Sequence, residues 1–168
     1  MSGKFYLHCL LLFHALLLTA CEKEPQVEMP PPQTLTQEAN GYYCLMTVAY
    51  HDGPKGHIIL TDNKVHWFAS IRDTISFTLS PEEPRNIAAI YVNDMSNASW
   101  ENPGDDNWID ARKAWYVIAS NRAGGMGSAE AVPFLTKAKA EEFTLKYGGI
   151  IKTFDTIPKN YILKPQIK

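Results

Sequence analysis

The sequence predicts an α+β fold made of two tandem, similar ββαβ units behind a lipoprotein signal and a flexible tether. Short apolar runs bounded by turn residues indicate strands, and two longer stretches have the spacing of amphipathic helices. The order strand, strand, helix, strand occurs twice along the chain. With 45% hydrophobic and 20% charged residues, the composition is that of an ordinary globular domain.

The first predicted unit spans residues 41–96. Asp62-Asn63 supplies a turn between two apolar runs, and a short stretch with helical spacing follows them. Its elements are expected in the order strand 57–61, strand 65–69, helix 71–79 and strand 87–92. Together they make one ββαβ unit.

Residues 97–158 contain a connecting loop and the second predicted unit. The segment 96–110 is acidic and polar, so we expect it to be a surface loop, although its carboxylates do not follow calcium-loop spacing. The elements that follow are strand 114–119, strand 131–134, helix 137–147 and strand 150–154. Thr136 is placed to cap the helix and Gly148 to end it. Residues 159–168 are predicted to form a C-terminal tail.

The N-terminus resembles a bacterial lipoprotein signal. Residues 1–20 contain an apolar run too short for a permanent membrane span, and they end in Leu-Thr-Ala before Cys21. We therefore expect cleavage before Cys21 and lipidation of its sulfur. Glu22 is not the aspartate that favours retention in the inner membrane, which predicts an outer-membrane anchor facing the periplasm. Residues 21–40 are rich in proline and glutamate and predict a lipidated, flexible tether.

The charge balance excludes one class of function. Lys4 is the only charged side chain in the signal, so the mature chain carries 15 basic and 18 acidic residues, a net charge of −3 with neutral histidines. This balance gives no indication of nucleic-acid binding. No other apolar run has transmembrane length, so membrane association is expected through the lipid anchor alone.

After signal removal and lipidation, Cys44 is the one free thiol, and Met46 follows two positions later. In a strand these side chains would point to the same face, and in a loop both sulfurs could still reach one ion. Thiolate and thioether are soft donors that favour Cu(I) over zinc. The alternative is that both residues fill a core strand, because cysteine and methionine are commonly buried.

Two other classes of function remain open at this point. Cys44 could be a redox or nucleophilic thiol, but the chain has no Cys-x-x-Cys pair and no resolving cysteine. It could also be a buried residue of a structural lipoprotein that binds no metal. The glycine-rich segment 124–128 lacks the lysine and spacing of a phosphate-binding loop, so nucleotide binding is not expected there.

Several motifs together carry a resemblance to a known family. They are Gly-Tyr-Tyr-Cys-Leu-Met-Thr-Val at 41–48, Gly-Pro-Lys at 53–55, Trp67-Phe68 with Arg72-Asp73, Trp-Ile-Asp-Ala at 108–111 before 114–118, and Met126-Gly127 before 130–134. In this combination the chain resembles NosL, the lipoprotein accessory factor of nitrous oxide reductase, from Gly41 to about Asp155. Leu45 departs from the family pattern, which usually has glycine at this position.

The resemblance implies a periplasmic Cu(I)-binding metallochaperone rather than an enzyme. It would deliver copper for the catalytic copper-sulfide centre of nitrous oxide reductase, together with a NosDFY-type transporter complex. It also implies a fold similar to two ββαβ units, with Cys44 and Met46 in the ligand positions. Met126 is our expected third ligand, because its glycine-rich loop allows close backbone approach, and His51 is the alternative. His57 and His66 rank behind His51.

Overall fold

The computed structural model describes residues 29–164, so the predicted signal, the lipidation site Cys21 and the first part of the tether lie outside the described residues. The first unit forms a four-stranded antiparallel sheet in the order β2-β1-β3-β4. Its elements are β1 (Gly56–Leu60), β2 (Val65–Phe68), α2 (Ile71–Leu79), β3 (Ile87–Asn93) and β4 (Trp108–Asp110). One helix therefore lies between the second and third strands, as predicted.

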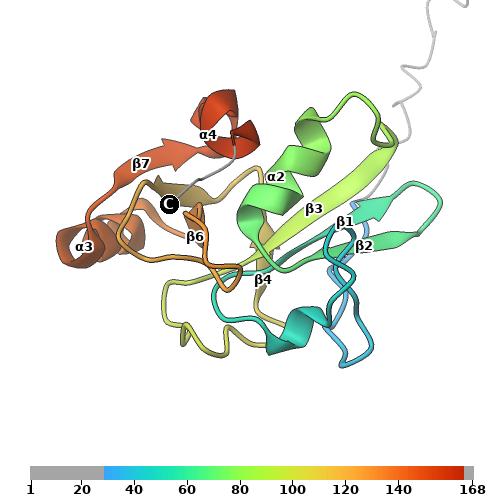
Figure 1. Ribbon diagram of the computed structural model, residues 1–168, viewed down its shortest axis with the longest axis horizontal. Coiled ribbons are helices and arrows are strands. Elements are labelled where there is room, and N and C mark those ends of the chain that lie inside the picture. Colours follow the sequence, from blue (N-terminus) through green and yellow to red (C-terminus); the bar gives the residue numbers. More distant parts are fainter. Residues whose placement is uncertain (1–28, 165–168) are drawn as a thin grey trace, which may run out of the picture.

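The second unit repeats this arrangement. Its elements are β5 (Trp115–Ile118), β6 (Val132–Phe134), α3 (Lys137–Tyr147) and β7 (Ile150–Thr153), and its sheet order is β6-β5-β7. In both units the first strand is central and pairs antiparallel with the second strand and with the strand after the helix. The tandem ββαβ prediction is confirmed, and Figure 1 shows the two units side by side.

Local signals position both helices. The side chain of Ser70 accepts a hydrogen bond from the N–H of Asp73 at the start of α2. Thr136 accepts in the same way from Lys139 at the start of α3, and Gly148, with φ +68°, ends that helix. Side-chain caps satisfy backbone donors that have no partner within the helix, which explains why both helices begin where the sequence indicated.

The two units share a continuous core. Helix α2 packs Ile71 and Ile75 in a buried cluster with Ile58 of β1, and this cluster also contains Tyr116 and Ile118 of β5. The Tyr116 hydroxyl, fully buried, donates to the Ala111 carbonyl at 2.6 Å. Because buried apolar surface crosses the repeat boundary, the relative position of the units is fixed by packing as well as by the connecting chain.

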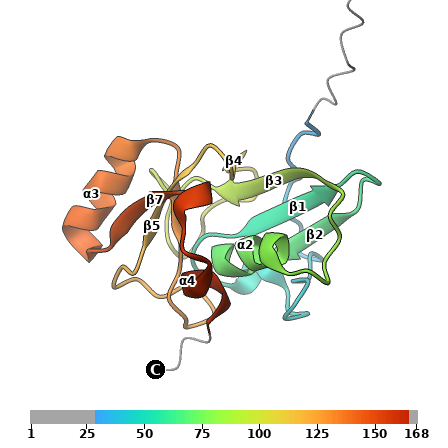
Figure 2. The ribbon, with the colours of Figure 1, turned by 90° about the horizontal axis from the view of Figure 1, so that it is seen from above.

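The face of the first sheet opposite α2 is covered by the segment that enters the fold after residue 28. The N–H of Gln33 donates to Nε2 of His57 at 3.1 Å, and the Tyr91 hydroxyl donates to the Pro30 carbonyl at 2.6 Å. Leu35 is buried on the same side. Figure 2 shows α2 and this segment on opposite sides of the sheet. Residues 30–40, which the sequence assigned to the tether, are therefore part of the fold. They pack on the aromatic face of β1 and β3 and shield it from solvent.

Two further segments differ from the sequence prediction. The segment 96–110 was expected to be a loop throughout, but its end forms β4, which pairs with β3. A short 3-10 helix, η2 (Phe154–Thr156), comes just before the expected tail, and the tail itself contains a short helix, α4 (Lys159–Leu163), whose Ile162 is buried against the shared core. Both segments are too short to show a clear period in the sequence, and their structure depends on tertiary contacts. No helix in residues 29–164 has the length and apolar character needed to cross a membrane.

Candidate metal centre

Cys44 and Met46 lie in a tight turn rather than in a strand. The N–H of Gly41 donates to the Met46 carbonyl at 2.9 Å, and the N–H of Leu45 donates to the Gly41 carbonyl at 2.8 Å. The N–H of Tyr42 donates to the Trp67 carbonyl at 2.7 Å, which ties the turn to the edge strand β2. Of the two geometries that the sequence left open, the structure shows the loop. We call residues 41–46 the ligand turn.

The thiol of Cys44 is half-buried against the fold, whereas the thioether of Met46 is open to solvent. Cys44 packs beside a small buried cluster that includes Val48 and Ala69. Met46 keeps 44% of its surface exposed. An exposed methionine is not filling a core, so the core-strand alternative does not describe this motif. The ligand turn instead holds one sulfur in place and leaves the other accessible.

Leu45, between the two sulfur residues, has a backbone conformation that glycine prefers. Its φ is +57°, and its side chain is 78% exposed. A side chain in this left-handed region costs about 1–2 kcal/mol relative to ordinary conformations. The family resemblance expects glycine at this position, and the structure shows the physical reason. Leucine keeps the turn but strains it.

Two tyrosines attach the ligand turn to the segment after α2. The hydroxyls of Tyr42 and Tyr43 donate to the two carboxylate oxygens of Glu83, at 2.8 and 2.9 Å. The bond to Glu83 raises the pKa of Tyr42, and burial followed by the same carboxylate raises the pKa of Tyr43. The Tyr42 ring also packs edge-to-face on Phe77 of α2. These contacts hold the turn in addition to the hydrogen bond from Tyr42 to the Trp67 carbonyl.

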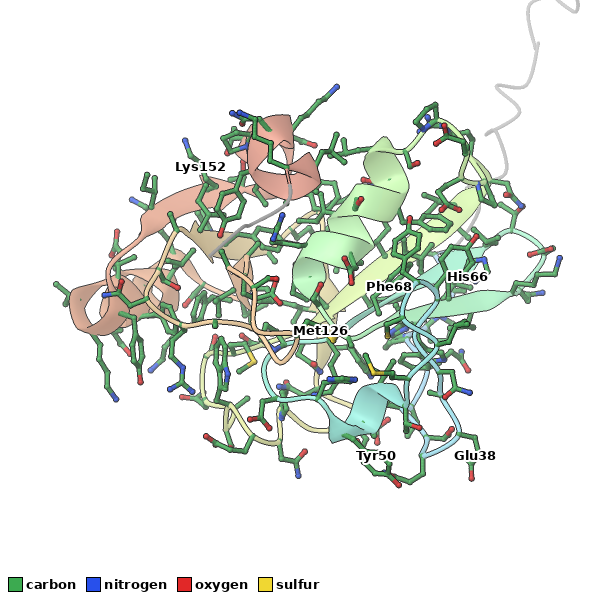
Figure 3. The ribbon with its side chains drawn as sticks, viewed as in Figure 1. Glu38, Tyr50, His66, Phe68, Met126 and Lys152 are labelled. Carbon is green, nitrogen blue, oxygen red and sulfur yellow. The ribbon has the colours of Figure 1, made fainter. Side chains whose placement is uncertain are left out.

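The loop that carries Met126 comes from the second unit and docks just beyond the ligand turn. The ligand turn leads through η1 (Val48–Tyr50) to His51 and Asp52, and Gly125 lies directly against these two residues. A β-carbon on residue 125 would collide with the Asp52 carbonyl and lie 3.0 Å from the His51 β-carbon. Met126 is 39% exposed and lies between the two units in Figure 3. The structure therefore brings the loops of Met126 and His51 together.

Beside Met126 is a cavity of about 280 Å³ that the sequence did not predict. The residues that line it include Arg72, Asp73 and Glu130. Glu130 is only 2% exposed, and its Oε1 accepts from the N–H groups of Arg72 and Ala131 at 3.2 and 2.9 Å. Burial raises the pKa of Glu130 to about 8. In the sequence this residue precedes a short apolar strand, which gives no sign that it is buried.

The remaining histidines are engaged elsewhere. His57 is fully buried, its Nε2 accepts from Gln33, and burial lowers its pKa to about 3. His66 packs against the Tyr42 ring at 4.4 Å between centroids, and burial lowers its pKa. Within residues 29–164, no three His, Cys, Asp or Glu side chains are grouped so as to hold a metal ion. The candidate donors of the ligand turn are the two sulfur atoms of Cys44 and Met46, and sulfur donors fit a soft monovalent ion better than zinc or calcium.

Comparison with known proteins gives a consistent result. The NosL family model matches residues 32–162. A copper-binding lipoprotein NosL from Achromobacter cycloclastes is 43% identical over 89% of this chain and 78% of its own length. Another, from Stutzerimonas stutzeri, is 31% identical over 83% of this chain and 73% of its own length. The crystal structure of the copper chaperone NosL from Shewanella denitrificans superposes with a TM-score of 0.72 at 37% identity, covering 77% of this chain and 98% of that one. The chain belongs to the NosL family.

Proposed function

We propose that this protein is a Cu(I)-binding metallochaperone in which Cys44 and Met46 hold the ion. The observation that carries this proposal is the ligand turn, which places a half-buried thiol and an exposed thioether two residues apart on one closed loop. Thiolate and thioether together are typical Cu(I) donors. Relatives that cover most of the chain are named copper-binding lipoproteins, which supports the choice of metal.

A third donor completes the proposed site, and we assign it to Met126. Two observations support this assignment: Gly125 packs closely on Asp52, shortly after the ligand turn, and the neighbouring Met126 side chain is accessible. His51 is the alternative, since its β-carbon lies against the same glycine. A sulfur donor matches the other two better than an imidazole does, which favours Met126.

The proposed cargo transfer follows from this low ligand number. A Cu(I) ion with two or three protein donors leaves room for a sulfur or imidazole of a receiving protein to bind before the first ligand dissociates. Met46 and Met126 are exposed, so the receiving donor can approach from solvent. Cys44 carries the negative charge and dominates affinity, and protons compete with copper for the thiolate.

The proposed destination is nitrous oxide reductase. The family membership supports delivery for assembly of its catalytic copper-sulfide centre, with a NosDFY-type transporter complex, the reductase itself, or both as recipients. Lipidation at Cys21 and a location at the outer membrane facing the periplasm belong to the same proposal. The naming of the relatives as lipoproteins supports the anchor.

An anaerobic Cu(I) titration against a chromophoric competitor tests the site. We expect one tightly bound ion in the chain that begins after Cys21, loss of tight binding in Cys44→Ser, and weaker binding in Met46→Leu and Met126→Leu. Met29→Leu is the matched control, because Met29 is also an exposed methionine but lies outside the site. If Cu(I) binding is weaker in His51→Gln but unchanged in Met126→Leu, the third ligand is His51 rather than Met126.

The same titration separates the other classes of function. A redox or nucleophilic thiol would react quickly with an alkylating reagent at neutral pH and would not hold Cu(I) tightly. A structural cysteine would neither react in the folded state nor bind copper. Equal affinity in the unaltered chain and in Cys44→Ser would remove the proposed site altogether.

A further inference from the structure

The two halves of the described chain carry opposite net charge. Residues 29–110 contain 11 acidic and 4 basic side chains, a net of −7, whereas residues 111–164 contain 4 acidic and 9 basic side chains, a net of +5. Figure 3 shows Glu38 of the acidic half and Lys152 of the basic half on opposite sides of the molecule. The ligand turn belongs to the acidic half.

Within residues 29–164, the four basic groups of the acidic half leave most of its carboxylates without an ion-pair partner. Lys55 is buried and donates to the Gly53 carbonyl, and Arg72 donates to the carbonyls of Ala129, Ile162 and Lys164. Lys64 pairs with Asp62, and Arg85 donates to the Thr78 carbonyl. Among the 11 acids of residues 29–110, only Asp62 and Asp110 form ion pairs. The acidic half therefore keeps its net charge of −7, although Lys55 lies close enough to Asp52 and Asp105 to interact with both carboxylates.

An exposed apolar surface surrounds the proposed copper ligands. We define the ligand-side patch as Tyr43, Leu45, Met46, Tyr50 and Met126, of which Tyr50 is 77% exposed. Three of these residues belong to the ligand turn, Tyr50 ends η1 directly after it, and the Met126 loop packs against the next two residues. Exposed apolar side chains gathered on neighbouring loops in this way are typical of a protein interface.

Carboxylates border the ligand-side patch. Glu83 accepts from both tyrosines of the turn, and Glu82 precedes it. The backbone of Asp52 lies against the Met126 loop and its side chain is exposed, and the exposed Glu38 lies next to Ala39, whose carbonyl accepts from Val48 of η1. The face thus has an apolar centre and an acidic rim. An anionic lipid surface would be repelled by this rim, and so would the same face of a second copy.

We propose that the ligand-side patch docks onto a copper-exchanging protein whose own docking face is apolar and rimmed by lysine and arginine. The proposal rests on the proposed function, because it names the chemistry of the partner at the same site. Opposite charge steers the two faces together and sets their orientation before the copper ligands exchange. The basic half of a second copy is a poorer occupant, since Cys44 is the only cysteine of the chain after Cys21 and that half offers no thiol to receive copper.

The test is the rate of copper transfer, followed by stopped flow. The Cu(I)-loaded mature chain is mixed with copper-free nitrous oxide reductase, with the periplasmic subunit of the transporter complex, and with a small uncharged dithiol that has no docking face. The variant Glu38→Gln/Asp52→Asn/Glu82→Gln removes three of the four rim carboxylates without changing a proposed ligand, and it keeps Glu83, which holds the two tyrosines of the turn. Lys139→Gln/Lys146→Gln/Lys152→Gln is the matched control, which removes three charges from the basic half.

We expect the rim variant to transfer copper about tenfold more slowly to at least one protein acceptor at low salt. The difference should disappear near 0.5 M salt, where the Debye length is only a few ångströms (about 4 Å). Transfer to the dithiol and Cu(I) affinity should be unchanged, and the lysine variant should show no fall in rate.

Three results would overturn the proposal. Equal transfer rates in the rim variant and the unaltered chain, with normal Cu(I) binding, would refute the docking surface and leave the proposed function intact. Self-association that the rim variant abolishes would reassign the patch to a second copy. Normal Cu(I) binding with no transfer to either protein acceptor would refute the proposed delivery and this surface together.

Discussion

Gly41 and Cys44 occupy one small volume, because a β-carbon on residue 41 would lie 2.5 Å from the Sγ atom of Cys44. That distance is far below an ordinary contact between carbon and sulfur. The thiol therefore occupies space that a side chain at residue 41 would fill. The two ends of the ligand turn are joined by the hydrogen bond from the Gly41 N–H to the Met46 carbonyl. The smallest residue in the turn thus sets where the strongest proposed copper donor lies.

Gly41→Ala tests this relationship. The added methyl group should push the Cys44 sulfur away from its present position, so we expect Cu(I) affinity to fall about tenfold or more, which corresponds to roughly 1.4 kcal/mol. Competition titration measures the change. Asn40→Ala is the control, since residue 40 is exposed and adds no atom beside the sulfur. Unchanged affinity in Gly41→Ala would mean that the thiol can relocate freely.

Leu45→Gly should relieve backbone strain in the ligand turn. Glycine accepts a φ of +57° without steric conflict, and little apolar burial is lost because Leu45 is mostly exposed. Glycine also increases the conformational entropy of the unfolded chain, which offsets part of the relieved strain. We therefore expect the free energy of unfolding to rise by up to about 1 kcal/mol. Urea denaturation would show this gain. Leu135→Gly, at an exposed position without positive φ, should instead lower stability.

The buried carboxyl of Glu130 makes stability depend on pH. Its pKa is raised to about 8 in the folded protein, so between its ordinary value near 4.5 and about 8 the folded state binds a proton that the unfolded state has lost. Stability should therefore decline as the pH rises through this window. Glu130→Gln, which resembles the protonated carboxyl, should be more stable than the unaltered chain by ~2–5 kcal/mol at pH 8 and equal to it near pH 4.5.

Thermal unfolding across this pH range checks the prediction. Glu141→Gln is a suitable control, because Glu141 is an exposed helical residue paired with Lys137, and its loss should change the melting temperature little at any pH. A constant difference between Glu130→Gln and the unaltered chain from pH 4.5 to 8 would contradict an elevated pKa for Glu130.

The segment at residues 30–37 should contribute to stability rather than act as a free linker. A chain beginning at residue 38 loses the buried side chain of Leu35 and the Gln33 donor to His57. We expect it to be less stable than a chain beginning at residue 29 by about 3–5 kcal/mol, from one buried leucine and one buried hydrogen-bond acceptor left without its donor. Equal denaturation midpoints for the two chains would show that this segment adds nothing to the fold.

The repeat could be predicted from sequence because its signals are local. Ile71–Leu79 and Lys137–Tyr147 are helices at the predicted bounds, since caps and apolar spacing mark both. Short strands such as β4, and the small helix α4, depend on partners that are distant along the chain. The covering role of residues 30–40 also lacked a signal, because an extended proline-rich chain looks the same whether it is solvated or lies on an aromatic face.

The candidate site was only partly visible in the sequence. The spacing of Cys44 and Met46 indicated a shared ion in either a strand or a loop, but the closed turn depends on hydrogen bonds between its two ends. The approach of Gly125 to Asp52 joins residues far apart in the chain, and glycine-rich composition indicated only that a close approach was possible there. Glu130 had no local signal at all, because burial of a single carboxyl depends on how the two units pack.

The docking of the Met126 loop onto the first unit has a mechanical consequence for a loaded carrier. If Met126 is the third ligand, as proposed, an ion bound by the ligand turn of one unit and by this methionine of the other would act as a removable cross-link between the two repeats. Loading should then raise the resistance of the whole domain to unfolding, since a ligand that binds only the folded state stabilises it. In the proposed cycle, giving up the cargo would remove this cross-link, so the emptied carrier should unfold more easily than the loaded one.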